Sequence, residues 1–183
     1  MFVISGPSGA GKGTVIALVK QRLAHVVTSV SATTRAARPG EQDGREYFFM
    51  ARAAFARGAA AGDFLEWVDY SGNLYGTLHA EVDGKLARGN DVILEIELVG
   101  ARAVRKALPE ATAVFIAPPS MAELSHRLRG RGTESDEAIA RRLSIAQTEV
   151  AAAGEFDHVV VNDDAERAAA EVVAIIEARR KGI

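Results

Sequence analysis

The sequence contains no cysteine, which excludes disulfide bonds and thiolate metal sites. It has no apolar run approaching the ~20 residues of a membrane span, and its first residues lack the basic and apolar regions of a signal peptide. With 22 Lys and Arg against 24 Asp and Glu, no overall charge favours nucleic acid or an anionic membrane. We therefore expect a cytoplasmic protein that binds small molecules, with strong positive charge confined to a local site. Nothing in the sequence indicates its oligomeric state.

Short, β-branched apolar runs alternate with helical patterns along the chain. The runs at residues 2–5, 26–30, 92–96, 113–117 and 158–161 are typical of buried parallel strands. Between them, spacings such as that of Val15, Val19 and Leu23 mark the apolar faces of helices. The alternation predicts an α/β fold with a parallel sheet flanked by helices.

Two segments interrupt this alternation. Residues 33–88 are richer in glycine, arginine and aromatic residues and contain short strand-like pieces at 46–50 and 64–70, which predicts an inserted substrate-binding subdomain. Residues 127–144 are rich in arginine and contain the break Gly130-Arg131-Gly132, which predicts a mobile lid. The core domain then comprises residues 1–32, 89–126 and 145–183.

A phosphate-binding loop is predicted between the first strand and the first helix, the context that a Walker A motif requires. Its glycines let backbone N–H groups converge on phosphate oxygens, and Lys12 adds a full positive charge. A Rossmann dinucleotide loop would need an acidic residue ~20 positions further on, where the sequence has Val30-Ser31-Ala32-Thr33-Thr34-Arg35 instead. The pattern therefore predicts a nucleoside triphosphate site formed by Gly6, Pro7, Ser8, Gly9, Ala10, Gly11, Lys12, Gly13 and Thr14.

The hydroxyl that usually binds magnesium is displaced by one position, because Gly13 follows Lys12 and Thr14 comes next. Either Thr14 reaches the magnesium shell or water fills that position, which magnesium tolerates well. The period of two in the strand at 92–96 places Glu95 and Glu97 on one side at its end. Glu95 is the candidate for a magnesium contact through water.

A second anion site is predicted within residues 33–49, where arginines, a glycine-rich turn and a tyrosine occur together. Arginine suits a monophosphate because its planar guanidinium binds phosphate with two hydrogen bonds. Composition alone favours a solvated loop with surface arginines.

The run from Thr33 to Met50, with its Arg-x-x-Arg, acid, glycine, tyrosine and aromatic residues, resembles the signature of the guanylate kinase family. The resemblance continues, in the family's order and over essentially the whole chain, in the segments 64–67, 71–77, 116–120, 130–133 and 161–164. The sequence departs from the family's usual pattern at Glu97, where Asp is usual, and at Val99, where Gln is common.

This resemblance implies ATP-dependent phosphorylation of GMP, and of dGMP, with Mg²⁺, on a P-loop NTPase core with a GMP-binding subdomain and an arginine-rich lid. A carboxylate can accept hydrogen bonds from the N1–H and the 2-amino group of guanine, so Glu66 is the implied residue that recognises the base. The implied GMP-binding residues are Ser31, Arg35, Arg38, Tyr47, Glu66, Tyr75, Thr77 and Glu97. ATP would be bound by the phosphate loop with Arg127, Arg131 and Asn162, and the implied catalytic residues are Lys12, Arg35, Arg131 and Arg142.

The helical spacing after Ser135 supports one of these lid residues independently. Ile139, Leu143 and Ala146 define its apolar face, and at about 100° per residue Arg142 lies roughly 70° from the centre of that face. We expect Arg142 to point inward and Arg141 to face solvent.

Two alternatives remain at this point. An adenylate kinase would also contain Gly11-Lys12-Gly13-Thr14, although the run at 33–49 and Glu66 argue against it. A binding module with the shape of a guanylate kinase but without catalysis would be expected to lose Lys12 or the acceptor arginines, and this chain retains both.

Overall fold

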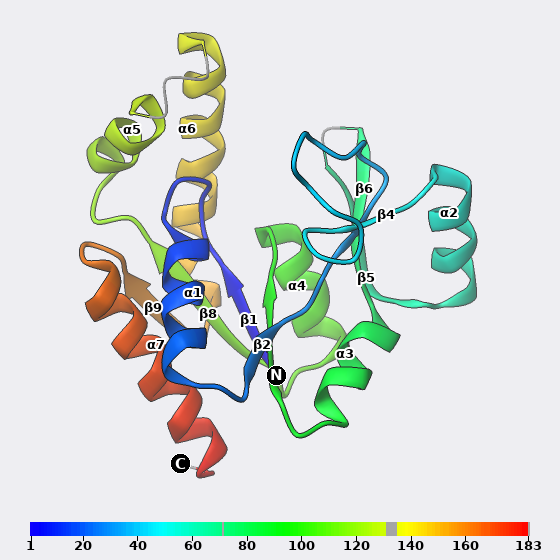
Figure 1. Cartoon of the computed structure of the whole chain (residues 1–183). Coiled ribbons are helices and arrows are strands. Elements are labelled where there is room, and N and C mark those ends of the chain that lie inside the picture. Colours follow the sequence, from blue (N-terminus) through cyan, green and yellow to red (C-terminus); the bar gives the residue numbers. More distant parts are fainter. Residues whose placement is uncertain (71, 131–134, 183) are drawn as a thin grey trace.

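A five-stranded parallel sheet forms the centre of the molecule in the computed structural model, which describes residues 1–70, 72–130 and 135–182 (Figure 1). Its strands run in the order β2-β7-β1-β8-β9 and are all parallel. All five predicted strands are present, and β2 and β7 each end slightly before the predicted residue. Their bounds are β1 Phe2–Ser5, β2 Val26–Thr28, β7 Asp91–Glu95, β8 Thr112–Ala117 and β9 His158–Val161.

Helices cover both faces of this sheet (Figure 1). Helices α1 (Lys12–Arg22) and α7 (Ala165–Arg180) pack on one face, where Phe2 and Ile4 of β1 point. Helices α3 (His79–Leu86) and α4 (Leu98–Ala107) lie on the other face, toward which Val3 points. The predicted α/β architecture is confirmed.

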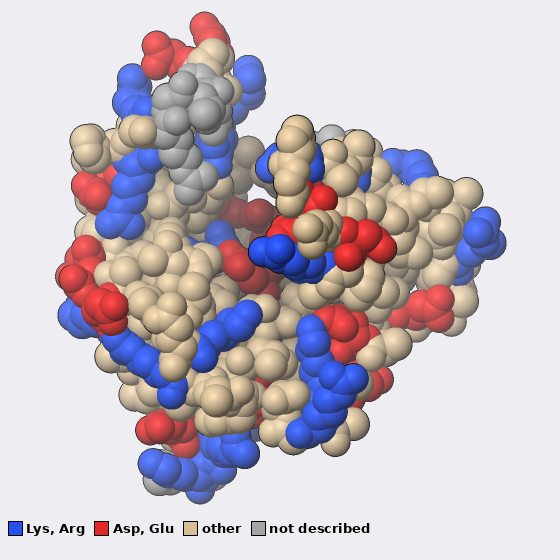
Figure 2. Space-filling model, viewed as in Figure 1, with Lys and Arg blue, Asp and Glu red and all other residues tan. Residues whose placement is uncertain are grey.

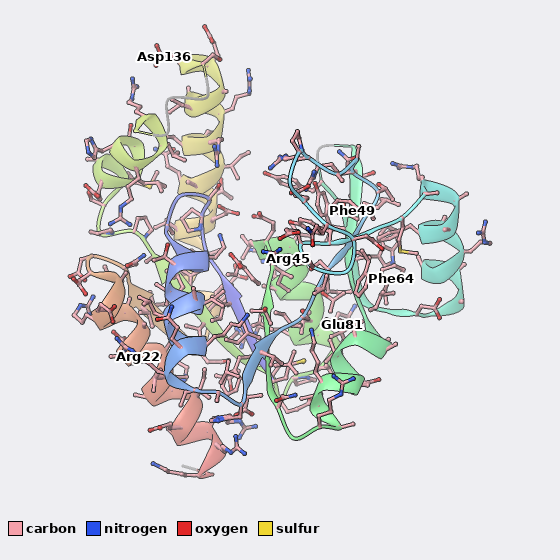
Figure 3. The ribbon with its side chains drawn as sticks, in the orientation of Figure 1. Arg22, Arg45, Phe49, Phe64, Glu81 and Asp136 are labelled. Atoms are coloured by element: carbon pink, nitrogen blue, oxygen red, sulfur yellow. The ribbon has the colours of Figure 1, made fainter. Side chains whose placement is uncertain are left out.

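A smaller sheet, in the order β4-β3-β6-β5, lies beside the core (Figure 1). Helix α2 packs on it, and the rings of Phe55 and Phe64 stack with centroids 4.2 Å apart; Phe64 lies between α2 and the small sheet in Figure 3. The strand-like piece predicted at 46–50 is shorter in the structure, because the preceding loop is held by turns around Gly44. The bounds are β3 Ala32–Thr33, β4 Phe48–Phe49, α2 Arg52–Ala61, β5 Phe64–Tyr70 and β6 Asn73–Leu78.

Helices α5 (Met121–Arg129) and α6 (Asp136–Ala151) project beyond the central sheet, with Asp136 at the far end (Figures 1 and 3). Leu124, Leu128, Ile139 and Ala146 form a small apolar cluster between them. Ser120 and Ser135 each cap a helix by accepting a backbone hydrogen bond.

Helix α6 runs without interruption through residue 144, the predicted boundary between lid and core, and the 3-10 turn Ala153–Glu155 follows it. Across the described part of the chain, no helix has both the length and the apolar character needed to cross a membrane.

Candidate active site

The loop between β1 and α1 has the backbone that a phosphate site requires. Gly11, the N-cap of α1, has φ of 88°, a conformation that glycine adopts without strain. A Cβ on Gly11 would lie 2.3 Å from Nδ2 of Asn162, so the loop has no room for a larger residue. The same Nδ2 donates a hydrogen bond of 2.7 Å to the carbonyl of Ala10. The buried Asn162 therefore fixes the loop from the end of β9.

Positive charge gathers at this loop. Lys12 Nζ donates to the carbonyls of Gly6 at 2.6 Å and of Pro7 at 3.3 Å, which holds the ammonium group over the loop. The first turn of α1 contains no acidic residue, so the partial positive charge of the helix N-terminus is not offset there. Such an arrangement attracts phosphate groups.

The arginines of α5 and α6 reach the same region. Arg142 donates to the hydroxyl of Ser8 in the loop, and Arg142 is partly buried whereas Arg141 is exposed, as the helical spacing predicts. Arg127 donates to the carbonyl of Asn162 at 3.1 Å and pairs with Glu123. Arg131, the remaining predicted lid arginine, lies outside the described residues.

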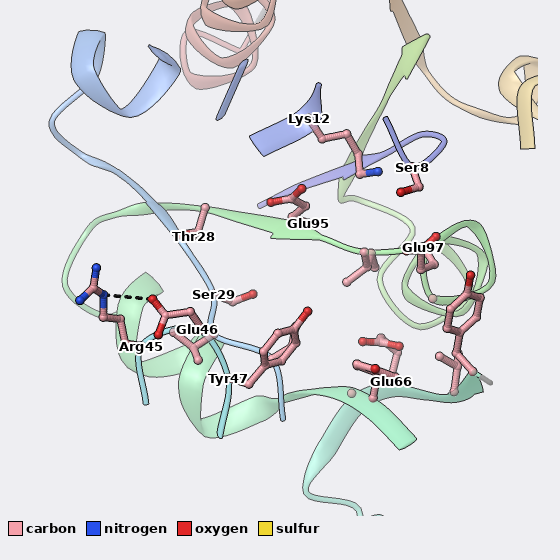
Figure 4. A pocket seen from close by; sticks show the side chains of 18 residues that line it. Ser8, Lys12, Thr28, Ser29, Arg45, Glu46, Tyr47, Glu66, Glu95 and Glu97 are labelled. Carbon is pink, nitrogen blue, oxygen red and sulfur yellow. Dashed lines mark ion pairs between the residues drawn. The ribbon is translucent and has the colours of Figure 1, made fainter. Parts of the chain in front are cut away.

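A cavity of about 500 Å³ separates the phosphate loop from the small sheet. Figure 2 shows this hollow with acidic and basic side chains inside it. Ser8, Lys12 and Glu95 lie on one side of it, and Tyr47 and Glu66 lie opposite (Figure 4). Of the predicted site residues, the cavity is lined by Ser8, Lys12, Ser31, Tyr47, Glu66, Tyr75, Glu95 and Glu97.

Glu66 presents a buried carboxyl group to this cavity. It is 6% exposed, and Thr77 Oγ1 donates a hydrogen bond of 2.8 Å to its Oε1. Burial raises the pKa of Glu66, and the hydrogen bonds from Thr77 partly oppose that rise. Thr77 is itself fully buried, so its hydroxyl orients Glu66 rather than lining the cavity. A carboxylate held in this way is suited to accept hydrogen bonds from two adjacent donors of a ligand.

An arginine and two tyrosines form the corner beside Glu66. The guanidinium of Arg35 lies 5.3 Å from the ring centroid of Tyr47, and the rings of Tyr47 and Tyr75 meet edge to face. Glu41, which the sequence did not single out, accepts two hydrogen bonds from Arg35 at 2.9 and 3.0 Å. This pairing raises the pKa of Arg35 and lowers that of Glu41.

Arg38, the other predicted phosphate ligand, is exposed on the same loop. Its backbone N–H donates to Glu41 at 2.7 Å, and its side chain does not line the cavity. The structure thus brings Arg35, Tyr47 and Tyr75 together and leaves Arg38 at the periphery.

The two predicted magnesium residues are placed differently. Glu95 lines the cavity on the side of Lys12, and burial raises the pKa of Glu95 while Lys12 lowers it. Thr14 is exposed on the first turn of α1 and does not line the cavity. Within the described ranges, no group of three or more His, Cys, Asp or Glu residues could enclose a metal ion. One carboxylate beside a phosphate loop nevertheless fits magnesium, which retains several waters and uses phosphate oxygens as ligands.

Three further residues near the cavity were not predicted from the sequence. Ser29 lines it with a buried hydroxyl that has no hydrogen-bond partner among the described residues. Tyr70 lines it from β5. Glu149 of α6 is 7% exposed, and burial together with the neighbouring carboxyl group of Glu97 raises the pKa of Glu149 to about 7. A buried acid near the end of α6 is visible only in three dimensions, because its sequence neighbours are those of any amphipathic helix.

Comparisons with known proteins agree on one family. A family model described as guanylate kinase matches residues 1–179. A guanylate kinase of a Synechococcus strain is 54% identical over 170 residues, covering 93% of this chain and 90% of that protein. One from Frankia casuarinae is 55% identical over 176 residues, covering 96% of each. The crystal structure of guanylate kinase from Anaplasma phagocytophilum is 32% identical and superposes with a TM-score of 0.77, covering 98% of this chain and 85% of that one.

Proposed function

The chain belongs to the guanylate kinase family and transfers the γ-phosphate of ATP to GMP, and we propose that it does so in the cavity between the phosphate loop and the small sheet. The observation that carries this assignment is the arrangement of two binding walls that face each other. Lys12 and Ser8 lie on one wall, and Glu66 and Tyr47 lie on the other (Figure 4). A donor triphosphate and an acceptor monophosphate can therefore approach each other across a single open cavity.

GMP binds on the wall formed by the small sheet. Glu66 accepts from N1–H and the 2-amino group of guanine, with Thr77 holding its carboxylate and with Ser31 and Glu97 beside the base. Arg35, Tyr47 and Tyr75, with Arg38 when the loop closes, bind the phosphate. Because these residues address the base and the phosphate rather than the ribose, dGMP serves as a second acceptor.

ATP binds on the opposite wall. The backbone N–H groups of the phosphate loop, other than Pro7, and Lys12 hold its phosphates, and Arg127 and Asn162 contribute on the side of its base. A phosphate oxygen of GMP attacks the γ-phosphorus as the bond to the oxygen that bridges the β- and γ-phosphates breaks. Lys12, Arg35, Arg142 and Arg131 stabilise the charge that develops. No side chain has to act as a nucleophile.

Glu95 is the residue that would hold Mg²⁺, through water, beside the ATP phosphates. When bound, Mg²⁺ supplies charge neutralisation at the β- and γ-phosphate oxygens.

The segments 33–88 and 127–144 act as the GMP-binding subdomain and the lid. They exclude water when they close on the core, which comprises residues 1–32, 89–126 and 145–183. The expected cytoplasmic location is part of the same proposal.

The test is turnover with a panel of acceptors. The purified protein is assayed for ADP release with ATP and Mg²⁺ and with GMP, dGMP, AMP, CMP or UMP. We expect turnover with GMP and dGMP and a kcat/KM at least about 10⁴-fold lower with AMP. Equal use of AMP would contradict the role of Glu66. A higher Mg²⁺ concentration for half-maximal activity in Glu95→Gln than in the unchanged protein would identify Glu95 as the residue that holds the metal, and an unchanged Mg²⁺ requirement would contradict that role.

A further inference from the structure

The carboxylate of Glu66 lies against a glycine of a helix from the other part of the molecule. Gly100, the third residue of α4, is buried at the back of the cavity. A Cβ on Gly100 would lie 3.0 Å from Oε2 of Glu66 and 3.5 Å from its Cδ. Helix α4 belongs to the core, whereas Glu66 belongs to the small sheet, so this close approach links the core to the small sheet.

The contact leaves Glu66 little room to adjust. Its Oε1 is held by Thr77 at 2.8 Å, and the carboxyl group is 6% exposed. A methyl group at Gly100 would therefore have to displace Oε2 by a few tenths of an ångström or force α4 away from β5. Either movement rotates the carboxylate relative to a bound base.

The first turn of α4 also contributes charge. The N–H groups of this turn carry partial positive charge, which favours the ionised form of a nearby carboxyl group. Close approach requires that no side chain intervene at Gly100, since the distance to Oε2 is already at the limit for a Cβ. The ionised carboxylate is the form that can accept from two guanine donors at once.

We propose that Gly100 is a specificity-determining position, at which the absence of a side chain lets α4 set the orientation of Glu66 toward guanine. This inference rests on the proposed role of Glu66 as the base reader. It assigns part of the guanine selectivity to the core domain rather than to the small sheet alone.

The experiment compares Gly100→Ala with Gly84→Ala. Both glycines lie inside helices, where alanine is the better helix former, but a Cβ on Gly84 of α3 would meet nothing within 4 Å. We expect Gly100→Ala to raise KM for GMP about tenfold, with KM for ATP and the thermal midpoint little changed. Gly84→Ala should leave both KM values unchanged.

A double variant separates this effect from a general disturbance of α4. In a Glu66→Ala background there is no carboxylate to displace, so adding Gly100→Ala should change KM for GMP by less than about twofold. An additional loss of the same size in that background would overturn the inference, and so would an unchanged KM for GMP in Gly100→Ala alone. If Glu66→Ala itself leaves KM for GMP unchanged, the proposed base reader is wrong, a result distinct from failure at Gly100.

Discussion

Thr77 and Glu66 lie directly opposite each other in the antiparallel pair β5–β6, and the threonine hydroxyl donates a hydrogen bond of 2.8 Å to the glutamate carboxylate. Both residues are buried, and they lie in a small sheet whose interior is otherwise mostly apolar, with the buried hydroxyl of Thr33 bonded to the carbonyl of Leu74. A charged group in such surroundings is costly unless it is paired or functional. This pair is therefore the polar centre of the subdomain, and the first predictions concern it.

Glu66→Gln should raise KM for GMP about 100-fold, equivalent to roughly 2.7 kcal/mol. Glutamine preserves the shape of the side chain but can turn an amide N–H₂ toward donors of guanine, which leaves donors facing donors. KM for ATP should remain within twofold, because the phosphate loop lies across the cavity. Steady-state kinetics with each substrate varied in turn measures both values. A parallel rise in both KM values would point to misfolding instead.

The pH dependence of GMP use should respond to Thr77. Burial raises the pKa of Glu66 above its ordinary value, so protonation on acidification begins at a higher pH than for an exposed glutamate. The protonated carboxyl group loses an acceptor, and KM for GMP should therefore rise as the pH falls. Thr77→Val removes the side-chain hydrogen bond that lowers the pKa of Glu66 and keeps the backbone one, so the acidic limb of log(kcat/KM) should move to higher pH.

The substrate supplies its own control in this experiment. The phosphate of GMP titrates identically with both proteins, so only the difference between the two pH profiles reports on Glu66. Coincident profiles would mean that Glu66 does not control binding of the base.

Lys12→Ala should reduce kcat by at least about 10³-fold while the affinity for GMP, measured by calorimetry, stays within threefold. Lys12 lies over the phosphate loop, on the wall opposite Glu66. Arg38→Ala provides the comparison, because it should weaken the binding of GMP and leave the binding of ATP unchanged. If Lys12→Ala weakened GMP as much as Arg38→Ala does, the two phosphate sites would have been assigned to the wrong walls.

Stability should depend on pH through Glu149. Its pKa is raised to about 7 by burial and by Glu97, with Lys12 acting in the opposite direction. In the folded protein Glu149 therefore keeps its proton up to a pH of about 7, whereas in the unfolded chain it loses the proton near the ordinary pKa of a glutamate. The free energy of unfolding falls as the pH rises from the ordinary pKa to the raised one. The loss should reach at most ~3 kcal/mol in the free energy of unfolding. Urea unfolding at pH 5 and pH 7.5 measures it, and Glu149→Gln should flatten the difference.

Much of the core could be predicted from the sequence because its strands, helices and phosphate loop depend on residues that are close together in the chain. The strand runs and the phosphate loop follow from apolar periodicity and from glycine spacing around Lys12, and Arg142 follows from the helical period. The pairing of Arg35 with Glu41 and the contact of Gly100 with Glu66 could not be predicted. The first depends on how an irregular loop turns, and the second brings a helix of the core against a strand of the small sheet. Neither leaves a periodic trace in the sequence.

The hydrogen bond from Asn162 to the carbonyl of Ala10 has a consequence for synthesis of the protein. The phosphate loop leaves the ribosome about 150 residues before the strand whose end holds it in place, since the two partners lie 152 positions apart. During translation the loop can form its turn, but it lacks the partner that fixes it until β9 has paired with β8. The hydrogen bond that fixes the phosphate loop is therefore formed only after β9 has been synthesised, long after the loop itself.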